Sequence, residues 1–99
     1  NWTLNNRLIR REIKLGVTYG SSSQEVIRIL TEAAARHSLV LDQPEPIATL
    51  SNFGEKSMEF TLFFWIDQND KTSAIVVESD LRIMIENRLT EEGIYIPIT

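Results

Sequence analysis

A short Gly-Ser stretch at residues 20–23 is the first candidate for chemistry in this 99-residue chain. It precedes a helical pattern, and the free amides at a helix start can bind phosphate. The stretch lacks the glycine density and the lysine of a P-loop. Ser22 and Glu25 instead fit a capping box, in which the hydroxyl and the carboxylate satisfy the first free amides. We therefore interpret residues 20–23 as a helix start rather than a phosphate site.

One histidine and two pairs of carboxylates are the remaining candidates for acid–base or metal chemistry. His37 falls in the last turn of the first predicted helix, where the helix dipole favours a cation, and no second ligand is near it in sequence. The pairs Glu91/Glu92 and Asp67/Asp70 sit in no recognisable calcium loop, so we interpret them as solvated surface. The chain has no cysteine, which excludes thiolate zinc sites and thiol nucleophiles. We predict no catalytic residue, no metal site and no cofactor.

Phe63 and Trp65 are the residues we expect to matter most for function. They lie in an alternating segment whose other face is strongly apolar, formed by Met58, Phe60, Leu62, Phe64 and Ile66. If that apolar face packs on helices, the rings of Phe63 and Trp65 must lie on the opposite, open face of the sheet. Large exposed rings usually mark a contact surface, so we predict a protein-contact face there.

RNA-recognition domains use the same sheet face to stack bases, so the charge of the chain is relevant. Residues 1–14 carry four basic side chains and one acidic one, whereas the remaining residues carry six basic and thirteen acidic ones. A body this acidic repels phosphate backbones, and the aromatic-glycine RNA motif is missing. We therefore predict no nucleic-acid partner.

The size and composition are those of one globular domain, with 42% hydrophobic and 24% charged residues. The longest strongly apolar run, residues 60–66, is far shorter than the roughly 20 residues of a membrane helix. The start at Asn1 shows no signal-peptide pattern. We expect a soluble segment excised from a larger protein.

The chain shows six predicted elements after an irregular start. They are a strand from about residue 11 to Tyr19, a helix from the Ser22 cap through His37, strands at 47–52 and 58–67, a helix at 72–92 capped by Gly93, and a strand at 94–96. This order, β-α-β-β-α-β with right-handed crossovers, predicts an α+β, ferredoxin-like fold with a four-stranded antiparallel sheet and two helices on one face.

We divide the chain into an extended, strand-like lead-in at residues 1–11 and the ferredoxin-like domain at residues 12–99. The lead-in is basic and lacks periodicity, so it is either a disordered end or the last strand of a preceding domain. In the second case Trp2 and Leu4 are candidate inter-domain contacts.

The same fold also hosts acylphosphatases, which hold phosphate with an arginine in the loop after the first strand. Residues 16–23 of this chain contain no arginine. We therefore predict that the domain is not an enzyme.

Five segments, in order along the chain, resemble one known family. They are Asn1-Trp2-Thr3-Leu4, the strand-like Ile13–Ser21, Pro44-Glu45-Pro46, Phe53-Gly54-Glu55-Lys56-Ser57 and Gly93-Ile94-Tyr95-Ile96-Pro97. Together they are similar to the end of the middle β-domain and the following α/β domain of the MscS family of mechanosensitive channels. The resemblance spans essentially the whole chain and is closest to the larger members, typified by the potassium-dependent channel.

The resemblance implies a structural role without chemistry. The parent is then a homoheptameric ion channel of the bacterial inner membrane that opens on membrane tension and releases solutes under osmotic downshock. This segment is expected on the cytoplasmic side, as a wall of the vestibule or cage. Its partners are copies of itself and the preceding β-domain, which residues such as Trp2, Leu4, Phe63 and Trp65 contact.

A second interpretation stays open on the sequence alone. The chain could be a free-standing ferredoxin-like regulatory or adaptor module that binds a protein or small ligand through its open sheet face. Such a module has no need of a basic strand before its first core residue, which favours the channel domain.

Overall fold

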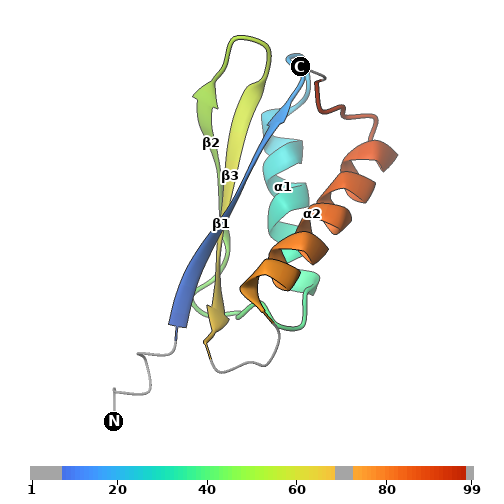
Figure 1. The fold of residues 1–99 in the computed structure, drawn as a ribbon. Coiled ribbons are helices and arrows are strands. Elements are labelled where there is room, and N and C mark those ends of the chain that lie inside the picture. Colours follow the sequence, from blue (N-terminus) through green and yellow to red (C-terminus); the bar gives the residue numbers. More distant parts are fainter. Residues whose placement is uncertain (1–7, 69–72, 98–99) are drawn as a thin grey trace.

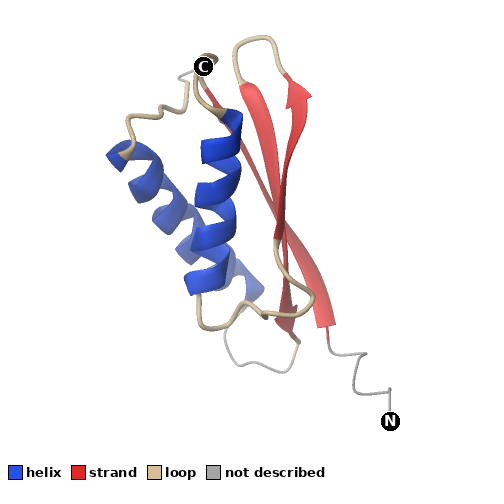
Figure 2. Ribbon diagram, turned by 180° about the vertical axis from the view of Figure 1, so that it is seen from behind, coloured by secondary structure: helices blue, strands red, loops and turns tan. Residues whose placement is uncertain are grey.

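The computed structural model describes residues 8–68 and 73–97. Its elements, in chain order, are the strand β1 (Leu8–Val17), the helix α1 (Ser23–Arg36), the strands β2 (Ile47–Phe53) and β3 (Met58–Asp67), and the helix α2 (Ala74–Glu91). The strands form an antiparallel sheet in the order β1-β3-β2. Both helices cover one face of this sheet, and the other face is open (Figures 1 and 2). The predicted α+β class is therefore confirmed.

The central strand β3 carries the core because its neighbours pair along both of its edges. Its alternation works as predicted, since Met58, Phe60, Leu62, Phe64 and Ile66 are all buried beneath the helices. The apolar stripes of the helices complete the core with Val26, Ile29, Leu30, Ala33 and Ala34 from α1 and Val77, Leu81, Ile85 and Leu89 from α2.

Local signals define the ends of both helices. The Ser22 hydroxyl accepts a hydrogen bond from the Glu25 amide at 3.3 Å, and Ser73 caps α2 in the same way. The Glu25 carboxylate pairs with Arg28 instead of reaching back to the cap. Gly93 has a φ of 72°, the left-handed conformation expected after the last turn of α2. Neither α1 nor α2 is long and apolar enough to cross a membrane.

The first strand begins three residues and ends two residues earlier than its alternating pattern indicates. β1 begins at Leu8, which pairs with Asp67, and it ends at Val17, which pairs with Met58. Tyr19 therefore lies beyond the strand, 48% exposed, and its hydroxyl donates to the carbonyl of Gly54. Residues 8–11 of the predicted lead-in thus belong to the same strand as the start of the domain, and the division at residue 11 stays a prediction.

The predicted fourth strand is not formed in the described part of the chain. Residues 94–97 are irregular and join the sheet through one backbone hydrogen bond, from the Thr18 amide to the Tyr95 carbonyl at 2.9 Å. Two neighbouring groups are unavailable for pairing. The Ile94 amide bonds to the Leu89 carbonyl at the end of α2, and Pro97 has no amide hydrogen.

A β-bulge interrupts β2 near its end. Leu50 pairs with Phe60 and Asn52 pairs with Glu59, so Ser51 is the additional residue. Because residues paired across antiparallel strands share a face, Phe53, which pairs with Met58, belongs to the helix-bearing face of the sheet. It lies at the β2–β3 hairpin, beyond the helices, and stays 69% exposed.

Candidate protein-contact face

Phe63 and Trp65 lie on the sheet face opposite the helices, as their alternation with buried residues of β3 requires. Both are half-buried. Phe63 is flanked by Glu12 of β1 and Ile47 of β2, and Trp65 lies opposite Arg10 of β1. The central position of β3 therefore places Phe63 in the middle of a three-stranded surface. Trp65 lies just beyond the start of β2, where the Leu41 amide bonds to its carbonyl.

Arg10 covers one of the two rings. Its guanidinium carbon lies 5.2 Å from the centroid of Phe63, the arrangement of a cation–π contact. The Arg10 side chain itself is 57% exposed and lies 3.9 Å from the Glu12 carboxylate. An exposed contact of this kind contributes about 0.5–1 kcal/mol, so a binding partner can displace Arg10 at small cost.

Two aliphatic residues extend the aromatic surface across the neighbouring strands. Leu8 of β1 is 39% exposed and Ile47 of β2 is 49% exposed. We define the open face as Leu8, Arg10, Ile47, Phe63 and Trp65. The sequence analysis missed the contributions of Leu8, Arg10 and Ile47.

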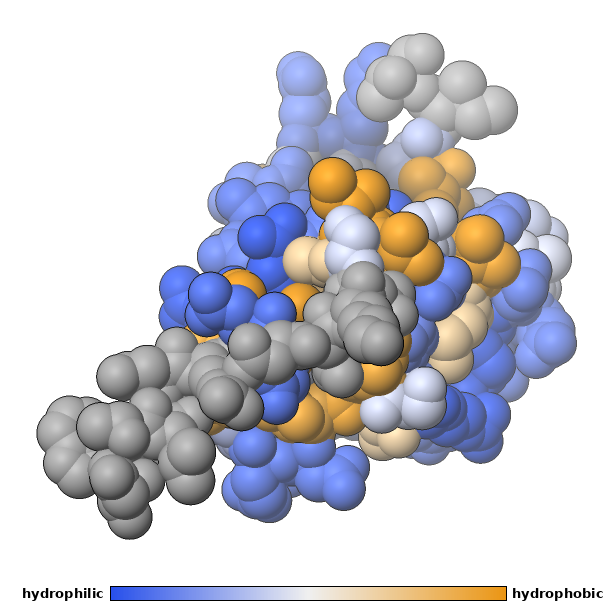
Figure 3. Space-filling model, turned by 60° about the horizontal axis from the view of Figure 1, so that its bottom comes forward, coloured by the Kyte–Doolittle hydropathy of each residue, from blue (hydrophilic) through white to orange (hydrophobic). Residues whose placement is uncertain are grey.

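Hydrophobic surface also gathers at the end of the molecule where β1 begins (Figure 3). α2 starts at this end and leaves Ile75 72% exposed and Val76 47% exposed. A surface with several neighbouring exposed aliphatic residues is typical of a contact site. The open face and this end thus lie next to each other, at the side from which the chain enters the domain.

The other half of the open sheet surface is polar and satisfied internally. The Thr61 hydroxyl donates to the Ser51 hydroxyl, which donates to the Glu59 carbonyl, each at 3.1 Å. Asn52 donates to the Glu59 carboxylate at 3.1 Å. These groups satisfy one another, so the predicted contact face is limited to the aromatic half.

His37 joins the two helices. Its ring is 9% exposed, Nδ1 accepts from the Leu39 amide at 3.1 Å, and Nε2 lies 2.9 Å from the Asp80 carboxylate. Because Nδ1 is an acceptor here, Nε2 carries the hydrogen and donates to Asp80. His37 therefore acts as a structural link between the end of α1 and α2.

The remaining candidates from the sequence do not form a common site. Ser22 is engaged as a helix cap, and Glu91 and Glu92 lie exposed at the end of α2. Asp70, Trp2 and Leu4 lie outside the described residues. Within residues 8–68 and 73–97, no group of three or more His, Asp or Glu side chains is arranged to hold a metal ion.

A cluster of charged side chains, separate from the His37–Asp80 contact, also connects the two helices. The Glu32 carboxylate of α1 accepts from Arg28 at 2.9 Å and lies 3.0 Å from the Arg88 guanidinium of α2. The hydrogen bond from Arg88, and to a lesser degree the one from Arg28, lowers the pKa of Glu32 from its ordinary value of 4.5. The hydrogen bond from Arg28 to Glu25 and the one to Glu32 also raise the pKa of Arg28. This cluster stabilises the helix layer on the side away from the open face.

Comparison with known sequences gives one family. Residues 12–96 match the family model described as "Mechanosensitive ion channel MscS, C-terminal". The chain is 35% identical over 74 residues to an uncharacterized MscS family protein of Haemophilus influenzae, and 33% identical over 66 residues to the mechanosensitive channel MscK of Escherichia coli. These matches cover 74% and 67% of the chain but only 7% and 6% of the two relatives.

Solved structures give the same result. The closed-state crystal structure of Helicobacter pylori MscS is similar at a TM-score of 0.83 and 27% identity, over 96% of this chain and 37% of that one. The cryo-EM structure of wild-type AtMSL1 has a TM-score of 0.71 over 94% of this chain and 33% of that one. Its identity of 16% makes it a comparison of fold alone.

Proposed function

Because the chain belongs to the MscS family of mechanosensitive ion channels, we propose that it is a wall segment of the cytoplasmic vestibule of such a channel. The observation that carries this proposal is the match of residues 12–96 to the carboxy-terminal domain of the family. The parent channel opens on membrane tension and releases solutes under osmotic downshock. It resides in a bacterial inner membrane, and this domain lies on the cytoplasmic side.

The role of the domain itself is assembly, without catalysis, cofactor or nucleic acid. Its partners are copies of itself in a homoheptamer and the β-domain that precedes it. Residues 1–11 form the end of that preceding domain, and Trp2 and Leu4 contact it. β1 crosses this boundary as one continuous strand, so it would link the preceding domain directly to the core at Ile13 and Val17.

The open face is the contact surface for the preceding domain or a neighbouring subunit. Its support is the combination of half-buried rings at Phe63 and Trp65 with exposed Leu8 and Ile47 beside them. The face includes Leu8, the first residue of β1, so a preceding domain is within reach of it.

We further propose that residues 94–96 complete a ferredoxin-like sheet as a fourth strand in the assembled protein. The Thr18–Tyr95 hydrogen bond supports this, because it brings the segment to the free edge of β1. A register continued from that bond places Ile96 opposite Val17, so this short strand leaves the edge of β1 from Leu8 to Gly16 open.

The experiment that tests the function uses the full-length protein containing this chain. It is expressed in a bacterial strain that lacks its own mechanosensitive channels, and survival after osmotic downshock is measured against an empty vector. Patch-clamp recording of the same membranes must show a conductance that membrane tension activates. If the cells survive without such a conductance, or if neither survival nor the conductance is observed, the proposal is contradicted and the free-standing adaptor module is favoured.

A further inference from the structure

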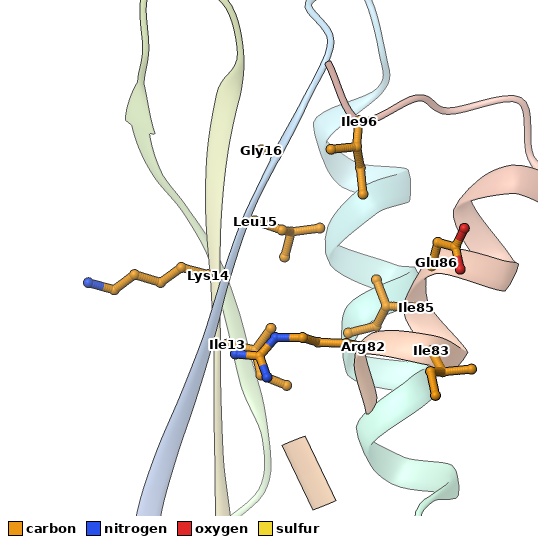
Figure 4. A pocket seen from close by; sticks show the side chains of 9 residues that line it. All are labelled: Ile13, Lys14, Leu15, Gly16, Arg82, Ile83, Ile85, Glu86 and Ile96. Atoms are coloured by element: carbon orange, nitrogen blue, oxygen red, sulfur yellow. The ribbon is translucent and has the colours of Figure 1, made fainter. Parts of the chain in front are cut away.

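A groove between β1 and α2 lies outside the open face. Its volume is about 450 Å³, and aliphatic side chains dominate its lining, namely Ile13, Leu15, Ile83, Ile85 and Ile96. In Figure 4, Leu15 and Ile96 point into the groove, and Arg82 extends across it from α2 toward β1. Lys14 contributes only its backbone, because its side chain points away from the helices.

The strand edge beside this groove is open. β1 pairs with β3 along one edge, and along its other edge residues 8–68 and 73–97 form no backbone hydrogen bond with it. The nearest such bond joins Thr18, one residue beyond β1, to Tyr95. An open strand edge next to an apolar groove is a site where another chain can dock.

The opposite edge of the sheet carries a protruding ring. Phe53 lies at the β2–β3 hairpin and is 69% exposed, the largest exposure of any described aromatic residue. Glu55 follows it in the hairpin turn. Since the sheet order is β1-β3-β2, the groove and this ring lie toward opposite edges of one molecule (Figure 1).

The two edges also carry opposite charge. β1 contains three basic side chains and one acidic one, and the groove beside it is lined by one further cation, Arg82, and one anion, Glu86. The segment at residues 41–57, which contains β2 and the hairpin turn, holds three acidic side chains and one basic one. Such charges attract when unlike edges of two copies meet and repel when like edges meet.

We propose that the groove binds the β2–β3 hairpin of a second copy of this chain, with Phe53 seated among the isoleucines and Glu55 facing Arg82. The inference rests on the proposed function, because it names surfaces through which copies in the channel meet. The two surfaces differ, so each copy offers one to each neighbour. A head-to-tail contact of this kind closes into a ring when its rotation allows. A buried Phe ring removes roughly 150–250 Å² from water, enough to anchor the contact.

The absence of cysteine from the chain allows a direct test. Two single variants, Lys56→Cys in the hairpin turn and Ile96→Cys, are mixed at high concentration and oxidised, and disulfide-linked dimers are identified by mass spectrometry. Phe53 and Glu55 stay in place in both variants. Lys56 and Ile96 are both exposed, so each variant should fold, which circular dichroism verifies. Ile75→Cys, 72% exposed at the opposite end of α2, is the matched control. Sedimentation velocity on the unmodified chain reports self-association independently.

The mixed 56–96 disulfide must exceed both the 56–56 product and every product with residue 75. Adding Arg82→Glu to the Ile96→Cys variant should lower the mixed yield about five-fold, as expected for one exposed charge pair, and Glu55→Arg on the other copy should restore it. Self-association with cross-links elsewhere overturns this inference and leaves the proposed function intact. If the chain neither self-associates nor forms any cross-link, both this inference and self-assembly through this domain are overturned.

Discussion

Arg10 and Phe63 meet diagonally across β1 and β3. The guanidinium carbon of Arg10 is 5.2 Å from the Phe63 ring centroid, although the register places Arg10 opposite Trp65 and Phe63 opposite Glu12. The long arginine side chain therefore covers part of the aromatic surface of the open face. Because the cover is a solvent-exposed side chain and not backbone, the surface can be uncovered by a partner without any change in the fold.

The first prediction concerns that surface. Replacing Phe63 and Trp65 together with serine should leave the fold intact, because both rings are half-buried and lie outside the core. We expect a loss of about 1–2 kcal/mol, seen as a lower midpoint of thermal unfolding. Assembly of the full-length protein, measured by native mass spectrometry, should weaken. Glu91→Ser, an exposed substitution at the end of α2 and outside both proposed contact surfaces, is the control. Unchanged assembly in the double variant rules out the open face as a contact.

A second prediction contrasts two phenylalanines. Phe64 is fully buried beneath the helices, whereas Phe53 is 69% exposed. Phe64→Ala should destabilise the domain by about 3–5 kcal/mol, because it leaves a cavity in the core. Phe53→Ala should change the free energy of unfolding by less than about 0.5 kcal/mol. Urea unfolding of both variants gives the two values, and similar losses would contradict the assignment of Phe53 to an exposed contact.

The third prediction concerns acid. Since Arg88 and Arg28 hold the folded-state pKa of Glu32 below 4.5, its contribution to stability is complete above that value. It is lost as the pH falls below 4.5 and through the lower folded-state pKa. Thermal unfolding measured from neutral pH down to about pH 3 should therefore show a smaller acid-induced loss in Glu32→Gln than in the wild-type chain. Parallel pH profiles for the two proteins would show that the charge of Glu32 does not make the stability depend on pH.

The fourth prediction tests the end of α2. An alanine Cβ at Gly93 would meet no atom within 4 Å, so the cost of Gly93→Ala comes only from its φ of 72°. We expect a loss of roughly 1–2 kcal/mol in unfolding free energy. Gly93→Asn should lose less, because asparagine tolerates the left-handed region better. Equal losses for the two variants would indicate that the backbone changes conformation instead.

Much of the fold follows from patterns close together in the sequence. The alternation in β3 predicted which side chains lie beneath the helices, and Ser22 and Gly93 predicted where α1 begins and α2 ends. These features depend on strand period, hydrogen bonding within one turn and backbone φ, which are properties of a few adjacent residues. The open position of Phe63 and Trp65 followed from the same alternation.

The contact surfaces themselves depend on residues far apart in the chain. Leu8 and Arg10 show no strand pattern, and they join β1 because β3 extends to Asp67 and pairs with them. The bulge at Ser51 reverses the face on which strict alternation would place Phe53. The groove exists because residues 94–97 touch β1 at one bond and leave the rest of its edge open. The sequence thus determined the elements and their buried faces, whereas register, strand edges and the surfaces between elements were decided only by long-range pairing in the tertiary structure.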